Sequence, residues 1–230
     1  MLSVTTSLLT FVIIILGIVL SLAGVFIDGV YAGNSVSLIA QAKGQDLVTL
    51  VIAVPALLIA LIFALRGSIR GALAVAGLLG YFLYTYASYA FMVQFNKWFL
   101  GYVALFSCSL FTFILLVTSL LKAIPTMISV PPAPLRVSAV LFLIVAMAIL
   151  VMWLSQIIPA MFGKSARIIE DSVDKPVIQV LDLGVIVPAA IVIAVLVFRG
   201  APTGPVWATI LLVKGLTLAL AIVSMTIFMA

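Results

Sequence analysis

Residues 46–65 read DLVTLVIAVPALLIALIFAL, an almost unbroken apolar stretch whose one charged side chain, Asp46, stands at its start. A bilayer core of about 30 Å needs about 20 apolar residues, because each helical residue rises about 1.5 Å. The stretch therefore predicts a transmembrane helix.

Six further runs of this kind are separated from one another by glycine, proline or charged residues. The seven predicted spans cover residues 7–26, 46–65, 71–92, 98–121, 138–158, 176–198 and 205–228. Of the 230 residues, 67% are hydrophobic and 7% are charged, whereas a soluble domain is about 25% charged. The composition excludes a water-soluble globule. We expect an all-α polytopic membrane bundle of seven transmembrane helices, forming one domain over residues 1–230.

The first run has no basic residue before it and is long enough to span, so we expect a retained helix rather than a cleaved signal peptide. Histidine is absent and Cys108 is the one cysteine. The chain therefore lacks the side chains that are needed for Cys/His zinc sites, for histidine-ligated haem, and for Ser-His or Cys-His catalysis. An enzyme is the least favoured class. The net charge of +5 comes from residues at helix ends and does not indicate nucleic-acid binding.

Two parts of the chain resemble each other. Val54-Pro55-Ala56 is followed by Arg66-Gly67, and Val187-Pro188-Ala189 is followed by Arg199-Gly200 at the same distance. The offset of 133 residues predicts two parallel repeats of three helices, at about residues 1–95 and 135–230, joined by a linker helix at about 98–121. Sugar transporters of the SWEET type share this three-one-three plan. Chance recurrence in a biased composition is the alternative.

The two prolines each lack an amide hydrogen and clash with the carbonyl four residues earlier. We expect kinked helices at Pro55 and Pro188 that act as hinges, with free carbonyls at Val51 and Gly184. The alternative is that these kinks serve packing alone.

Two ionisable residues lie deep in the predicted spans, Lys214 in the seventh and Asp182 in the sixth. A charge near the bilayer centre costs about 2.5–3.5 kcal/mol, so each should face the interior and have a partner. Lys214 and Asp182 are candidate partners: the two spans run antiparallel and place them about 10 Å apart in depth, a gap that the long lysine side chain could partly close. Gln179 precedes Asp182 by three residues and shares its helix face.

The third predicted span carries hydroxyl groups at helical spacing. One side holds Tyr81, Tyr84, Thr85, Ser88 and Tyr89, and the opposite side holds Leu79, Leu83, Ala87 and Ala90. We expect the hydroxyl side to line a polar interior and the other side to face lipid. Anchoring at the membrane interface is the alternative, and it fits Tyr86 and Tyr89 best.

Other polar residues are interpreted more simply. Gln45, Asp46 and Thr49 open the second span, where Asp46 could act as the N-terminal cap. The loop with Glu170, Asp171 and Asp174 lacks calcium-loop spacing, so we expect a solvated connection and no metal site.

Basic residues in short loops predict orientation. One side carries bases only: Arg66, Arg70, Lys122, Arg136 and Arg199. The other carries as many bases, Lys43, Lys97, Lys164, Arg167 and Lys175, together with acids. Placing the purely basic side in the cytoplasm predicts that the N-terminus lies inside.

The runs GQDLVT (44–49), YFLYTYASY (81–89), LDLG (181–184) and VKG (213–215) resemble a family of small, uncharacterised prokaryotic seven-helix membrane proteins. The resemblance covers most of the chain and implies a prokaryotic cytoplasmic membrane protein, but it implies no activity. Lys214 in the seventh span is also similar to the retinal-binding lysine of microbial rhodopsins. Ile210 departs from the rhodopsin pattern, since ion pumps of that class carry an acid there.

We expect a transporter or permeation protein for a small solute or ion, surrounded by membrane lipids. Its polar site would lie near the midplane between the repeats, with Lys214, Asp182, Gln179, Tyr81, Tyr84, Thr85 and Ser88 as binding residues. The alternative is a ligand-binding or sensory protein that holds a lipid, a quinone or a retinal-like chromophore. Any cofactor stays unidentified from the sequence, and a structural or assembly role also remains open.

Overall fold

The computed structural model describes residues 2–123, 131–163 and 176–230. It divides into two compact units, which are described separately. The first unit comprises Met1–Met127 and Thr209–Ala230, and the second comprises Ile128–Ala208. The predicted Glu170, Asp171 and Asp174 loop lies outside the described residues.

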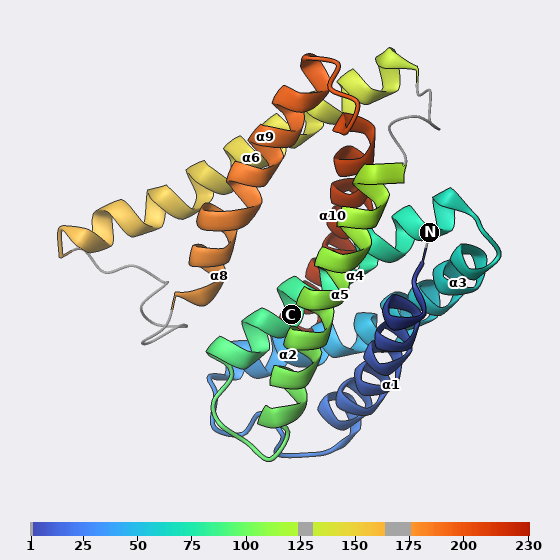
Figure 1. Cartoon of the computed structure of the whole chain (residues 1–230). Coiled ribbons are helices and arrows are strands. Elements are labelled where there is room, and N and C mark those ends of the chain that lie inside the picture. Colours follow the sequence, from blue (N-terminus) through green and yellow to red (C-terminus); the bar gives the residue numbers. More distant parts are fainter. Residues whose placement is uncertain (1, 124–130, 164–175) are drawn as a thin grey trace. The chain divides into compact units, whose positions relative to one another are not determined.

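The described residues form helices and short connections (Figure 1). The elements are α1 (Val4–Phe26), α2 (Val36–Val48), η1 (Thr49–Ala53), α3 (Val54–Leu65), α4 (Ile69–Met92), α5 (Phe99–Ala123), α6 (Pro132–Met161), α8 (Val177–Leu181), η2 (Asp182–Ile186), α9 (Val187–Phe198) and α10 (Gly204–Met229). Because α2, η1 and α3 run on continuously, as do α8, η2 and α9, they build seven helices long and apolar enough to cross a membrane. The predicted all-α, seven-span membrane protein is confirmed.

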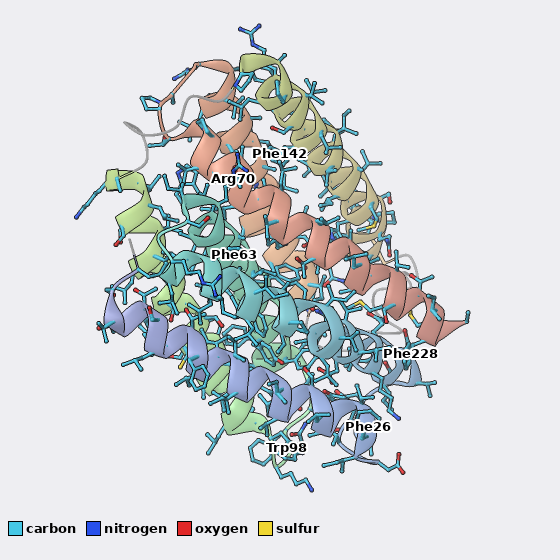
Figure 2. All side chains as sticks on the ribbon, turned by 90° about the vertical axis from the view of Figure 1, so that its right-hand side faces the viewer. Phe26, Phe63, Arg70, Trp98, Phe142 and Phe228 are labelled. Atoms are coloured by element: carbon cyan, nitrogen blue, oxygen red, sulfur yellow. The ribbon has the colours of Figure 1, made fainter. Side chains whose placement is uncertain are left out.

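Large apolar side chains point away from the helices over much of the surface. Phe26, Phe63 and Phe228 are exposed examples (Figure 2). In water such a surface would drive aggregation, whereas against acyl chains it carries no such penalty. The protein is therefore an integral membrane protein in contact with lipid.

The second span begins ten residues earlier than predicted, at Val36 rather than Asp46. The hydroxyl of Ser35 caps its first turn by accepting a hydrogen bond from the backbone N–H of Leu38 at 3.2 Å. The expected role of Asp46 as the helix cap is therefore wrong. Polar residues lower the hydropathy of this first part of α2, so a search for apolar runs misses it. Asp46 lies inside the span.

The helix α4 is the most deeply buried span of the first unit. It packs against α3 and α5, and Gly77 on α4 lies against Val213 of α10. Leu79 and Ala87, which we expected to face lipid, are buried because helices cover α4 on several sides. Tyr86 and Tyr89 are also buried, which contradicts the alternative that they anchor at the membrane interface.

The two proline-bearing spans contain the same local distortion. A five-residue π-helical segment, η1 or η2, stands directly before the α-helix that carries Pro55 or Pro188. In each, a backbone N–H donates to the carbonyl five residues earlier, from Val54 to Thr49 and from Val187 to Asp182. Such wide turns relieve the proline clash and interrupt the regular ladder. Movement about these prolines remains a prediction.

Candidate functional site

Asp46 is the most conspicuous polar group inside the first unit. It lies in α2 with 1% of its surface exposed, and its two carboxylate oxygens accept hydrogen bonds from different tyrosines. The phenol of Tyr31 donates to Oδ2 at 2.5 Å, and that of Tyr89 donates to Oδ1 at 3.2 Å. Among the described residues, its hydrogen-bond donors are thus neutral phenols rather than lysine or arginine.

Tyr31 reaches this carboxylate from outside the spans. Its loop connects α1 to α2 and turns at Gly29, whose φ of 81° favours glycine. The Tyr31 side chain is nevertheless buried. Burial, and then the neighbouring charge of Asp46, raise the pKa of the Tyr31 phenol far above its usual range, so it stays a neutral donor.

Gly24 lets α1 approach the carboxylate closely. A Cβ atom at Gly24 would overlap the side chain of Asp46 and would stand 2.6 Å from the Tyr31 hydroxyl. Glycine is therefore required here by the close packing of α1 against the Asp46 and Tyr31 pair.

The hydroxyl of Tyr89 has two acceptors and one hydrogen. It lies 3.0 Å from the backbone carbonyl oxygen of Ala42 and 3.2 Å from Asp46 Oδ1. A phenol can donate to one of them at full strength at a time. The group can therefore donate toward either the backbone or the carboxylate.

A second polar cluster lies beside the first, formed by Gln45 and Thr49 from α2 and η1 with Tyr81 and Thr85 from α4. The Gln45 amide donates to the Tyr81 hydroxyl at 2.6 Å and to the Thr85 hydroxyl at 3.0 Å. Thr49 donates to the carbonyl of Gln45 at 2.9 Å, so Tyr81 is the donor in its 2.8 Å bond with Thr49. These buried groups satisfy one another and fix α4 against α2.

The predicted hydroxyl side of the third span is found, in part, at this contact. Tyr81, Thr85 and Tyr89 follow at four-residue spacing on α4 and bond to residues of the second span. Ser88 is buried but donates to the carbonyl of Tyr84 in its own helix.

The buried Lys214 of α10 lies against Tyr84 and Gly80 of α4, within the first unit. Its ammonium nitrogen is 4.2 Å from the centre of the Tyr84 ring, a cation–π distance. Gly80 leaves room for the lysine stem, since a Cβ there would lie 3.6 Å from it. The structure thus brings two predicted site residues, Tyr84 and Lys214, together.

In the second unit, Asp182 begins η2 and Gln179 lies one turn earlier, both with little exposure. The indole N–H of Trp153 on α6 donates to Asp182 Oδ2 at 2.8 Å. Trp153 was not among the predicted site residues. Lys214 belongs to the first unit and Asp182 to the second, and their pairing stays a prediction.

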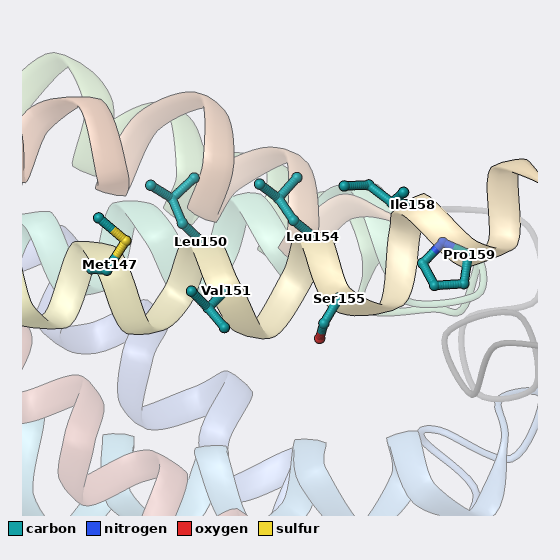
Figure 3. Close-up of a pocket in the computed structure, with 7 residues that line it drawn as sticks. All are labelled: Met147, Leu150, Val151, Leu154, Ser155, Ile158 and Pro159. Carbon is teal, nitrogen blue, oxygen red and sulfur yellow. The ribbon is translucent and has the colours of Figure 1, made fainter.

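The helix α6 carries an open groove of about 480 Å³ (Figure 3). Its lining is almost wholly apolar: Met147, Leu150, Val151, Leu154, Ser155, Ile158 and Pro159. Such a lining suits hydrocarbon. Across residues 2–123, 131–163 and 176–230, no three His, Cys, Asp or Glu side chains gather to hold a metal ion.

No protein-family model, curated protein or solved structure matches the chain. The fold and the site themselves define a class: a polytopic integral membrane protein with seven candidate spans and a buried network of aspartate and tyrosine.

Proposed function

We propose that this protein is a transporter or permeation protein for a small solute or ion, and that Asp46 takes up and releases a proton during its cycle. The arrangement of Tyr89 between Ala42 and Asp46 carries the proposal, because it supplies hydrogen bonds for both protonation states. An ionisable group inside a span is costly and is typical of proton relays in pumps and transporters.

The two states differ in the direction of one hydrogen bond. With Asp46 ionised, Tyr31 and Tyr89 both donate to its oxygens. With Asp46 protonated on Oδ1, the carboxyl group donates to the Tyr89 oxygen, and Tyr89 donates to the carbonyl of Ala42 at 3.0 Å. No buried donor loses its acceptor in either state, so neither state suffers the penalty of an unsatisfied group.

Coupling to a solute would run through the neighbouring helices. Asp46 stands one turn before η1, and the second polar cluster joins that turn to α4 through Tyr81. The affinity for a solute bound near Tyr81, Tyr84 and Lys214 would therefore depend, through α4, on whether Asp46 is protonated. The Pro55 and Pro188 spans would rock about η1 and η2 to alternate access.

The matched distortions support the repeat as part of this proposal. The bounds of η1 and α3 reappear in η2 and α9 at the 133-residue offset, and glycines with positive φ follow both, Gly67 and Gly200. In each unit the preceding long helix packs on these segments, α1 in one and α6 in the other. Two three-helix repeats, a prokaryotic cytoplasmic membrane and an inside N-terminus belong to the same proposal.

The test uses the full chain in liposomes that contain a pH-sensitive dye. Proton movement is followed under an imposed membrane potential, without solute and with a panel of sugars, amino acids and inorganic ions. We expect Asp46→Asn to abolish the movement. Asp28→Asn is the matched control, because Asp28 is exposed in the same loop as Tyr31.

Equal proton movement in Asp46→Asn and Asp28→Asn would overturn the proposal. A purified protein that holds a chromophore, quinone or lipid and moves no protons would instead favour the ligand-binding alternative.

A further inference from the structure

Tyr31, the nearer donor to Asp46, is itself linked to a further phenol. Its hydroxyl shares a hydrogen bond with that of Tyr102 in the first turn of α5, and the Tyr102 hydroxyl shares another with the side chain of Asn96. Tyr31 and Tyr102 are buried, whereas Asn96 lies half-buried in the loop between α4 and α5. Three side chains thus connect the buried carboxylate with the surface.

The direction of these hydrogen bonds follows from the number of hydrogens available. A phenol carries one hydrogen, and that of Tyr31 goes to Asp46 Oδ2. Tyr102 must therefore donate to the Tyr31 oxygen, and the Asn96 amide N–H donates to the Tyr102 oxygen. The amide oxygen of Asn96 accepts from the backbone N–H of Trp98 at 2.8 Å, which agrees with the amide nitrogen as the donor. Beside the ionised carboxylate, the bonds therefore run in one direction, from the loop amide to the carboxylate.

Packing holds these groups in place. The Tyr102 ring contacts the rings of Tyr89 and Tyr86 at 5.4 Å and 6.4 Å between centroids. The α1–α2 loop is tied to the α4–α5 loop, because the backbone N–H of Gln94 donates to the Asn34 side chain at 2.9 Å. The fold itself therefore sets the positions of the two linked phenols.

Other phenols near the carboxylate lead elsewhere. Five lie close enough to interact with the charge of Asp46: Tyr31, Tyr81, Tyr86, Tyr89 and Tyr102. The hydroxyls of Tyr81 and Tyr89 bond to residues of the second span, and that of Tyr86 lies beside Ser21 of α1. Among the described residues, the route from the carboxylate to a loop therefore runs through the remaining two phenols.

We propose that Tyr102 and Tyr31 form a phenol relay that carries protons between water at the α4–α5 loop and Asp46. In one concerted step, a hydronium ion gives a proton to the Tyr102 oxygen, Tyr102 passes its own proton to Tyr31, and Tyr31 passes its own to Asp46 Oδ2. The hydronium ion becomes water, the carboxylate becomes a neutral carboxyl group, and neither phenol is left ionised. Asn96 keeps its hydrogens and is a positioning residue. The use of the relay in transport rests on the proposed function, whereas the route itself does not.

The relay delivers its proton to Oδ2, whereas Tyr89 faces Oδ1. Rotation of the carboxyl group about its last torsion exchanges the two oxygens, and this torsion has a broad, two-fold profile in aspartate. The rotation yields the form that is protonated on Oδ1 and donates to Tyr89. The two oxygens therefore connect the loop route with the hydrogen bonds of α4.

The test measures how fast Asp46 gains a proton in the full chain in nanodiscs. After a rapid drop in pH, infrared spectroscopy follows the carboxyl C=O band that is absent in Asp46→Asn. Tyr102→Phe keeps the ring and removes the relay hydroxyl, and Tyr86→Phe removes a buried hydroxyl of the same aromatic cluster outside the relay. We expect the band to rise severalfold more slowly in Tyr102→Phe, to the same final height, and at the wild-type rate in Tyr86→Phe.

A hydroxyl that serves packing alone would change the unfolding temperature and leave the rate of protonation unchanged. Equal rates in the wild type and Tyr102→Phe would therefore overturn the relay, and so would a wild type whose Asp46 gains no proton. In the dye-loaded liposomes, a wild type without proton movement that depends on Asp46 would overturn the proposed function, and the infrared rates would still decide the relay.

A measurement on the wild type covers the case in which Tyr102→Phe does not fold. In liposomes that hold the protein in one orientation, acid is added to one side at a time. Labelling of the exposed Lys97 by an amine reagent that does not cross membranes shows on which side the α4–α5 loop lies. We expect Asp46 to gain its proton severalfold faster from the loop side. Protonation that is no faster from that side would overturn the relay.

Discussion

Tyr31 and Asp46 are 15 residues apart in sequence and are joined by a hydrogen bond of 2.5 Å, which ties the α1–α2 loop to the buried part of the second span. The loop residue thus covers the carboxylate from outside the spans. A buried polar group that loses its hydrogen-bond partner costs about 1–3 kcal/mol.

Tyr31→Phe should therefore lower the free energy of unfolding by about 1–3 kcal/mol, because Asp46 loses its nearer hydrogen-bond partner and remains buried. Tyr89→Phe should cost less, because its bond to Asp46 is longer, at 3.2 Å. Thermal unfolding of both variants in detergent tests whether Tyr31→Phe is more destabilising than Tyr89→Phe. A Tyr31→Phe protein as stable as the wild type would show that this bond does not hold the loop.

The raised pKa of Tyr31 predicts a loss of stability in alkali. In the unfolded chain a tyrosine ionises near pH 10, whereas burial and the Asp46 charge keep the folded phenol neutral to higher pH. The folded state then holds a proton that the unfolded state releases. The contribution of Tyr31 is therefore complete below about pH 10 and declines as the pH rises further.

Unfolding midpoints between neutral pH and strong alkali provide the measurement. The wild-type midpoint should fall more steeply in alkali than that of Tyr31→Phe, which has no phenol to ionise at this position. Parallel curves for the two proteins would contradict the assignment.

The spans could be predicted from the sequence, whereas the central carboxylate of the site could not. Apolar runs determine which segments enter a bilayer, and this is why all seven spans were found. The first part of α2 contains Gln41, Lys43 and Gln45, so hydropathy placed the start of the helix at Asp46. The helix in fact begins after the Ser35 cap.

The hydroxyl spacing on α4 predicted Tyr81 and Thr85 correctly as inward-facing, because helical periodicity is a local property. Their partner Gln45 and the Tyr31 contact depend on packing between distant segments, which periodicity does not contain. Extending the helix pattern backwards from Thr49 through Asp46 and Ala42 would have been the available signal.

Gly24→Ala should destabilise the protein, because the added methyl group overlaps the Asp46 carboxylate and crowds the Tyr31 hydroxyl. Overpacking of this kind costs about 1–3 kcal/mol. Gly215→Ala is the matched control on α10, where an added Cβ meets no atom within 4 Å. That change should be neutral or stabilising by up to about 1 kcal/mol, since alanine favours helix. The two unfolding midpoints should move apart, and a shared shift would contradict the close packing at Gly24.

The last prediction concerns the cluster that joins η1 to α4. Tyr81→Phe removes the acceptor of the Gln45 amide and the donor to Thr49, and the buried Gln45 donor keeps only Thr85 as its partner. A buried donor deprived of its acceptor costs about 1–3 kcal/mol. Thr49→Val removes the hydroxyl at nearly constant volume and breaks the same Tyr81 bond from the other side. Because both single changes break one shared bond, the double variant should cost less than the sum of the two, by about 0.5–3 kcal/mol. Strict additivity in thermal unfolding would show that Tyr81 and Thr49 act independently.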